Sequence, residues 1–182
     1  MNGGGALRRI VVTGPESTGK TTLSRRLAEL AHAEWLPEAS RIYAERKGGE
    51  LLASDVAPIA REHIRLADAA AERARAGGNA LLVLDTDLLS TVIYARHYYR
   101  LVPDWVERIE RARRGDLYLL CDIDVPWIPD GIRDRPANRE EMFALFRDAL
   151  VRRKAPFVLV QGDWDKRWEI ARAAVAPFLA AR

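Results

Sequence analysis

Residues 10–21 have the sequence Ile-Val-Val-Thr-Gly-Pro-Glu-Ser-Thr-Gly-Lys-Thr, and this stretch decides the fold of the chain. The four β-forming residues at its start predict a strand. Apolar residues recur at helical spacing after it, which predicts a helix from Lys20 onward. The two glycines between them allow a turn whose backbone N–H groups point into one concavity, at the positive end of that helix. An ordinary Gly-rich surface loop needs neither neighbour, so we interpret the stretch as a phosphate-binding P-loop of the Walker A type.

A P-loop predicts ATP and Mg²⁺ as cofactors. Lys20 can reach the β and γ phosphates, which makes it a candidate catalytic residue, and the Thr21 hydroxyl can complete the coordination of Mg²⁺. The nucleotide-binding residues expected in this segment are Gly14, Glu16, Ser17, Thr18, Gly19, Lys20, Thr21 and Thr22.

The composition predicts one domain over residues 1–182. A chain of this length with 48% hydrophobic residues can bury a full core. The net charge is only +3 and the basic residues are scattered, which argues against a nucleic-acid partner. The single cysteine, Cys121, excludes an intrachain disulfide and a metal cage built from several thiolates. We expect a cytoplasmic protein with no membrane partner, because no apolar stretch has the length of a signal peptide or a membrane span; a homo-oligomer stays open.

Short apolar runs alternate with amphipathic segments along the chain. The runs lie at residues 9–13, 34–37, 80–84, 117–121 and 157–161. This alternation predicts an α/β fold, a doubly wound parallel five-stranded sheet in the order 2-3-1-4-5 with helices on both faces and a lid. One long helix is expected over 54–76, with Ser54 as its N-cap, and Asn138 with Glu141 resembles a capping box at the start of another.

Two carboxylates follow the apolar run at 80–84. Ligands of open parallel sheets gather at the carboxyl ends of the strands, so Asp85 and Asp87 should face the phosphates. Asp85 is placed to hold Mg²⁺, directly or through water. Asp87 is a candidate substrate-binding residue, or simply the cap of a helix that starts at Leu88.

The end of the second predicted strand carries Glu38 and Arg41. Glu38 can accept a proton from a substrate hydroxyl, and Arg41 can steer a phosphate or hold that carboxylate. The alternative is a helix cap at Ser40 with Glu38 and Arg41 as a surface pair.

A loop rich in proline and arginine follows the fourth predicted strand, over residues 124–139. We expect it to act as a lid whose arginines neutralise charge on the transferring phosphoryl group, with Arg133 and Arg135 as catalytic candidates and Arg139 on the nucleotide. Trp127 offers a flat aromatic face, and Asp130 is a further substrate-binding candidate. The alternative is a solvated loop whose arginines pair with its own aspartates.

The fifth predicted strand leads into the sequence Gln-Gly-Asp-Trp-Asp-Lys-Arg at 161–167. Gly162 allows close approach of the backbone to a flat ring, and Arg167 can stack on adenine. The alternative is a turn followed by a helix cap at Asp163 or Asp165.

Taken together, these motifs resemble the ribosylnicotinamide kinase domain of NadR-type proteins, within the kinase group of P-loop folds. The resemblance covers nearly the whole chain. It rests on GPESTGKT at 14–21, EASR at 38–41, LDTD at 84–87 and PWIPDGIRD at 126–134. It implies transfer of the γ-phosphoryl group of ATP to the 5′-hydroxyl of nicotinamide riboside, with Glu38, Arg41, Asp85, Asp87 and Trp127 near the riboside. It also implies a free-standing kinase domain, without the other domains of the longer family members.

The expected mechanism is direct in-line transfer. Lys20, Mg²⁺ and the lid arginines would stabilise the γ phosphate, and either Glu38 or Asp85 would receive the hydroxyl proton. Two alternatives stay open: a kinase of another nucleoside or small metabolite, and a P-loop ATPase that acts as a regulatory switch.

Overall fold

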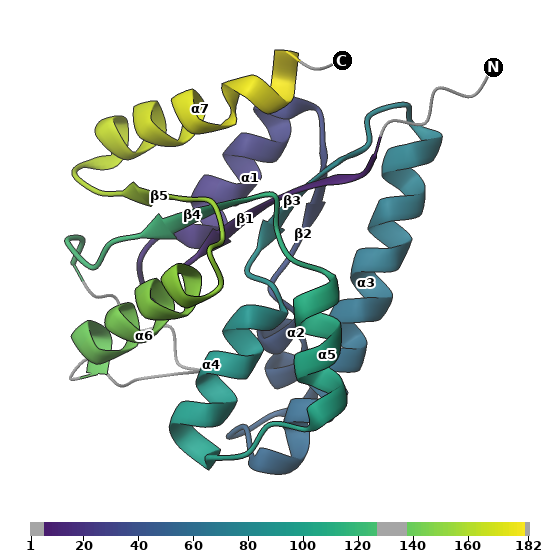
Figure 1. The fold of residues 1–182 in the computed structure, drawn as a ribbon, viewed down its shortest axis with the longest axis vertical. Coiled ribbons are helices and arrows are strands. Elements are labelled where there is room, and N and C mark those ends of the chain that lie inside the picture. Colours follow the sequence, from purple (N-terminus) through teal and green to yellow (C-terminus); the bar gives the residue numbers. More distant parts are fainter. Residues whose placement is uncertain (1–5, 127–137, 181–182) are drawn as a thin grey trace.

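The computed structural model describes residues 6–126 and 138–180, and its centre is a parallel sheet of five strands (Figure 1). The strands are β1 (Arg8–Thr13), β2 (Glu34–Leu36), β3 (Leu81–Asp85), β4 (Leu117–Cys121) and β5 (Phe157–Val160). Their order is β2-β3-β1-β4-β5, and each neighbouring pair is parallel. The predicted fold class and strand order are therefore confirmed.

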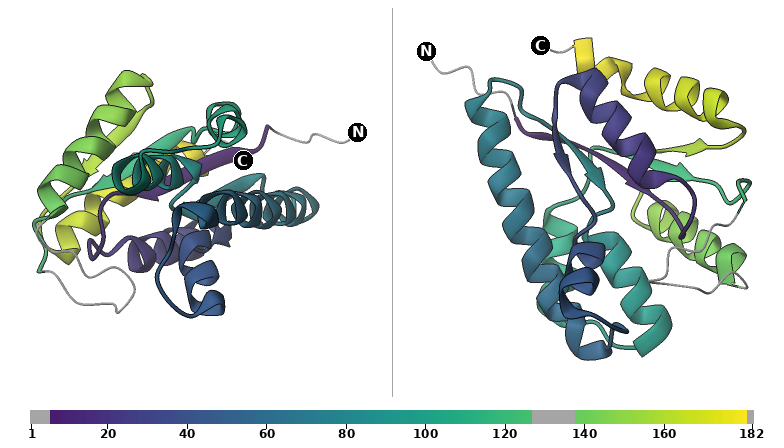
Figure 2. Two further views of the ribbon diagram at one scale, coloured as in Figure 1. Left: turned by 90° about the horizontal axis from the view of Figure 1, so that it is seen from below. Right: turned by 180° about the vertical axis from the view of Figure 1, so that it is seen from behind.

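Helices cover both faces of this sheet. They are α1 (Lys20–Ala31), α2 (Ala39–Lys47), α3 (Val56–Ala76), α4 (Leu88–Tyr99), α5 (Asp104–Ala112), α6 (Arg139–Arg152) and α7 (Trp164–Ala180). Helices α1 and α7 pack into one of the two cores that flank the sheet, and α3, α4 and α6 pack into the other; α3, α4 and α5 form a third, smaller cluster. Figure 2 shows α1 and α7 side by side on the same face of the sheet.

The strands are continuous apolar runs because both of their faces are buried. On β3, Leu82 and Leu84 join the core with α3, α4 and α6, whereas Leu81 and Val83 join the core with α1 and α7. Successive side chains of a strand point to opposite faces, so one short run serves both cores. This packing leaves only the strand ends free to carry polar chemistry.

One predicted helix start is wrong in detail, and one predicted capping interaction is absent. The helix expected from Ser54 begins at Val56, after a 3₁₀ turn at Ala53–Asp55. The Asp55 carboxylate accepts from the Leu52 N–H at 2.8 Å, and this contact stabilises the turn ahead of the helix. Asn138 is the N-cap of α6, but its backbone lies at φ −105° and ψ 8° and its side chain makes no cap hydrogen bond, so the predicted capping box is absent.

The helices in the described ranges do not offer a membrane span: none is long and apolar enough to cross a bilayer.

Candidate active site

The P-loop connects β1 to α1 in a conformation that needs its two glycines. Gly14 has φ +133°, and a Cβ at this position would lie 2.7 Å from the carbonyl oxygen of Cys121 on β4. Gly19 has φ +78°, and its missing side chain leaves room for the ring of Trp164. The loop therefore passes close to β4 on one side and to the start of α7 on the other.

The Lys20 side chain folds back over the P-loop. Its Nζ donates to the carbonyl oxygen of Pro15 at 2.6 Å, and the Thr18 hydroxyl donates to the same oxygen at 2.9 Å. Both residues are buried. The ammonium thus already lies above the concavity in which a phosphate would bind.

Thr21 and Asp85 meet at the carboxyl end of the central strands. The Thr21 hydroxyl donates to Asp85 Oδ2 at 2.5 Å. Asp85 Oδ1 is buried and has no hydrogen-bond partner among the described residues. A hydroxyl and a buried carboxylate oxygen with unused acceptor capacity fit Mg²⁺, which prefers oxygen ligands and takes the rest of its shell from water and phosphates. No cluster of three or more His, Cys, Asp or Glu side chains in 6–126 or 138–180 offers another metal site.

Glu38 lies next to this pair. It is buried at the N-cap of α2 and accepts from the Ser40 hydroxyl at 2.5 Å. Burial, followed by the negative charge of Glu38, raises the pKa of Asp85, while the charges of Lys20 and Arg41 act against that increase. Ser40 is therefore not the helix cap, and Glu38 and Arg41 belong to the charged group around Asp85 rather than to an isolated surface pair.

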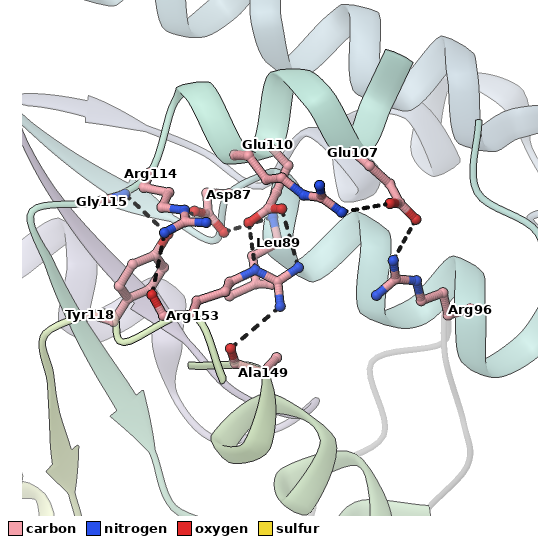
Figure 3. Close-up of polar contacts among 11 residues, drawn as sticks. Asp87, Leu89, Arg96, Glu107, Glu110, Arg114, Gly115, Tyr118, Ala149 and Arg153 are labelled. Atoms are coloured by element: carbon pink, nitrogen blue, oxygen red, sulfur yellow. Dashed lines mark hydrogen bonds and ion pairs between the residues drawn. The ribbon is translucent and has the colours of Figure 1, made fainter. Parts of the chain in front are cut away.

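Asp87 forms the N-cap of α4, which confirms its predicted role as a helix cap. It accepts from the Leu89 N–H at 3.0 Å and from the Tyr118 hydroxyl at 2.7 Å. Tyr118 in turn accepts from the Gly115 N–H at 3.0 Å (Figure 3). Burial is the main reason that the pKa of Asp87 rises to about 6, and the charge of Glu110 adds to it. The substrate-binding role of Asp87 stays a prediction.

Arg167 of α7 supports the P-loop through hydrogen bonds to backbone carbonyl oxygens, and we call this contact the Arg167 brace. Its guanidinium is almost completely buried and donates to the carbonyl oxygens of Gly162 at 2.8 Å, Thr18 at 3.2 Å and Asp122 at 2.9 Å. It also pairs with the Asp124 carboxylate, which accepts from the Gly162 N–H at 2.5 Å. The sequence predicts that Arg167 stacks on adenine, whereas its burial favours a role in supporting the P-loop; direct contact with the nucleotide stays a prediction.

Arg139 joins the same region from the first turn of α6. Its guanidinium donates to the carbonyl oxygen of Val125 at 3.1 Å and to that of Ser17, in the P-loop, at 3.4 Å. Desolvation lowers the pKa of Arg139, and the nearby charge of Arg167 lowers it further. The cap of α7 is Asp163, whose carboxylate accepts from the Lys166 N–H at 2.9 Å.

Four predicted site residues of the expected lid lie outside the described residues. They are Trp127, Asp130, Arg133 and Arg135.

A pocket of about 200 Å³ opens beside Asp87, between the P-loop, α2, α3 and α4. Most of the polar and aromatic residues that line it were not predicted from the sequence. The missed residues are Glu50, His63, Thr86, Ser90, Thr91, Tyr94, Tyr98 and Tyr99. A usable signal was the recurrence of tyrosine at 94, 98 and 99 on the helix that follows the two aspartates, because positions four apart lie on one helix face.

The whole arrangement matches a known family. The model of a family described as "AAA domain" matches residues 9–167. The chain belongs to this family. It is also homologous to the trifunctional NAD biosynthesis/regulator proteins NadR of Escherichia coli (strain K12), at 30% identity, and of Salmonella typhimurium (strain LT2), at 29%. Each alignment covers 89% of this chain, which spans only 40% of the length of either relative.

Solved structures show the same fold. A NadR protein crystallised in complex with NR matches 96% of this chain and 52% of its own, with a TM-score of 0.75 and 26% identity. A NadR protein in complex with NAD and AMP-PNP, at 24% identity and a TM-score of 0.72, matches 96% and 50%. A thymidylate kinase from Ehrlichia chaffeensis, at 13% identity and a TM-score of 0.66, matches 94% and 98%. The predicted resemblance is confirmed, and the chain is a P-loop nucleotide-binding domain of the kinase type.

Proposed function

We propose that this protein transfers the γ-phosphoryl group of ATP to the 5′-hydroxyl of nicotinamide riboside, giving nicotinamide mononucleotide and ADP. The observation that carries the proposal is the pocket beside Asp87, which adjoins the P-loop through Glu16 and α2 through Ala39 and Ser40. Thr86, the residue that follows Asp85, also lines it, so a molecule held there would adjoin both the P-loop and the end of β3. The homology to NadR, one member of which was crystallised with NR, supports this acceptor.

The lining of the pocket suits a cationic ring. Carboxylates of Glu16, Glu50 and Asp87 lie in its wall together with the rings of Tyr94 and Tyr98. None of the described residues that line it is lysine or arginine. The pyridinium ring of nicotinamide riboside gains from aromatic faces and from nearby acidic side chains, and this lining provides both.

Protein side chains would act both on the phosphates of ATP and on the hydroxyl of the acceptor. Lys20 holds negative charge on the β and γ phosphates, and Glu38 takes the proton of the attacking hydroxyl. We favour Glu38 over Asp85 as the base because Asp85 already accepts from Thr21 and fits the metal site. Mg²⁺, held by Thr21 and Asp85, would supply charge neutralisation on the phosphate oxygens when bound.

A nucleoside panel tests the proposal. We expect ADP release to require nicotinamide riboside and to be at least tenfold slower with uridine, thymidine or cytidine, which carry no fixed positive charge. Equal or faster turnover of an uncharged nucleoside would overturn the acceptor and leave the kinase in place. ATP hydrolysis that no acceptor accelerates would instead favour a regulatory switch.

A further inference from the structure

His63 is a buried histidine that the proposed transfer does not use. It lies on α3, is only 6% exposed and lines the acceptor pocket. No hydrogen bond joins its imidazole to another residue within 6–126 or 138–180. A buried polar side chain normally has a partner, so an imidazole that borders a pocket in this way is placed to bond whatever enters it.

The imidazole is neutral under cellular conditions. Burial is the main reason that the pKa of His63 falls to about 4, and the positive charge of Arg113 lowers it further against the opposing effect of Asp68. On the pocket side, the facing titratable groups are the carboxylates of Glu16, Glu50 and Asp87 and the hydroxyls of the tyrosines on α4. A neutral imidazole offers one N–H donor and one nitrogen acceptor.

A carboxamide matches this pair of functions. Its carbonyl oxygen accepts and its amino group donates, so an amide can use either nitrogen of the ring. A carboxylate can only accept, and in this pocket it would bring a further negative charge to a lining that includes Glu16, Glu50 and Asp87. The lining also includes the apolar residues Val56 and Ile59 of α3, and His63 is the imidazole among its polar groups.

We propose that His63 determines specificity by bonding an uncharged amide on the ring of the acceptor, so that the pocket takes an amide-bearing pyridinium riboside and rejects the corresponding acid. This inference rests on the proposed function, because it assumes that the acceptor ring enters this pocket.

The experiment compares three acceptors: nicotinamide riboside, nicotinic acid riboside and the riboside of unsubstituted pyridine. In the wild type, we expect kcat/KM for the amide to exceed that for the acid by at least 100-fold. His63→Leu should lower kcat/KM for the amide by about 10- to 100-fold, mainly through KM, and leave the unsubstituted pyridinium riboside and the KM for ATP nearly unchanged. His63→Gln keeps a donor and an acceptor and should recover most of the loss.

A matched control is His32→Leu, at an exposed histidine that follows α1 and does not line the pocket. It should change none of the three acceptors. Should His63→Leu fail to fold, the ratio of amide to unsubstituted riboside in His63→Gln and in His63→Asn still tests the bond, because the shorter asparagine should lower that ratio.

Three results would overturn the inference while the proposed function stands. They are equal activity on the amide and the acid, equal loss on the amide and the unsubstituted ring in His63→Leu, and no loss on either. Turnover of an uncharged nucleoside with no activity on any pyridinium riboside would instead overturn the proposed function itself.

Discussion

At the scale of single residues, the site depends on charges that have been brought together in a dry environment. Lys20, Glu38 and Asp85 are all buried, and burial, followed by the charge of Glu38, raises the pKa of Asp85 while the charge of Lys20 acts against that increase. Electrostatic interactions in such surroundings are stronger than in water, so the arrangement can stabilise charge that develops on a phosphate. The same burial imposes a desolvation free energy on each charged side chain, which neighbouring charges and hydrogen bonds must offset.

Replacing Lys20 should therefore affect turnover far more than folding. The ammonium makes one hydrogen bond, to Pro15, and packs on the loop rather than in either core. We expect Lys20→Ala to lower kcat by about 100-fold or more and to shift the melting temperature only slightly. The exposed Glu29 of the same helix, α1, provides the control, because Glu29→Ala should leave kcat nearly unchanged. A well-folded Lys20→Ala protein with near-normal turnover would contradict the P-loop kinase assignment.

Glu38 offers a second test at this scale. If it is the base, Glu38→Gln should lower kcat for the riboside by about 100-fold or more, because the amide cannot take the proton. ATP affinity should stay within about threefold of the wild type, measured by nucleotide titration. If Glu38→Gln retained full kcat, Asp85 would become the candidate base.

At the scale of elements, Arg167 connects segments that are far apart in the chain. Its guanidinium lies on α7 and donates to carbonyl oxygens of the P-loop, of the residue after β4 and of the turn after β5. These three segments approach one another only because β1, β4 and β5 are neighbours in the sheet. One buried side chain thus holds the P-loop in register with the carboxyl edge of the sheet.

Loss of this brace should cost both stability and ATP affinity. Arg167→Ala leaves three carbonyl oxygens and the Asp124 carboxylate without their partner, and we expect the free energy of unfolding to fall by about 3 to 5 kcal/mol. KM for ATP should rise in the protein that remains folded. Arg172→Ala removes an exposed arginine of the same helix and should change the free energy of unfolding by less than about 0.5 kcal/mol. Chemical denaturation of the two variants gives the comparison, and equal stability would rule out the brace.

At the scale of the whole molecule, His63 links folding to pH. Its pKa is about 4 in the folded protein and near 6.5 when the chain is unfolded. The unfolded state therefore binds the proton first. The stability that His63 contributes is fully present above pH 6.5 and is lost as the pH falls toward 4.

We expect this effect to reach about 3 kcal/mol in the free energy of unfolding between pH 6.5 and pH 4. Carboxylates also make the free energy of unfolding depend on pH. The test therefore compares how steeply that free energy falls with pH in two proteins. Urea denaturation from pH 7 to pH 4 should give a steeper decline in the wild type than in His63→Gln, which has no imidazole to protonate. Parallel curves would mean that His63 is not held neutral by burial.

The sequence by itself determined the features that depend on neighbours along the chain. The P-loop could be recognised because glycine, lysine and threonine must stand at fixed spacing between a strand and a helix, and the apolar runs placed all five strands. The carboxylates Asp85 and Asp87 were predictable because they follow β3 directly. Local signals failed at Asn138, where an N-cap residue was expected to bond through its side chain and its backbone conformation prevents this.

Only the tertiary structure decided which distant residues share a site. The pocket combines Glu16, His63 and Tyr94 from three segments, and neither the periodicity of α3 nor that of α4 distinguishes a pocket wall from a core face. The contacts of the buried Arg167 guanidinium with the P-loop were likewise not predictable from the sequence. The physical reason is that spacing along a helix or strand sets which side a residue faces, whereas desolvation and partners depend on what the fold packs against that side.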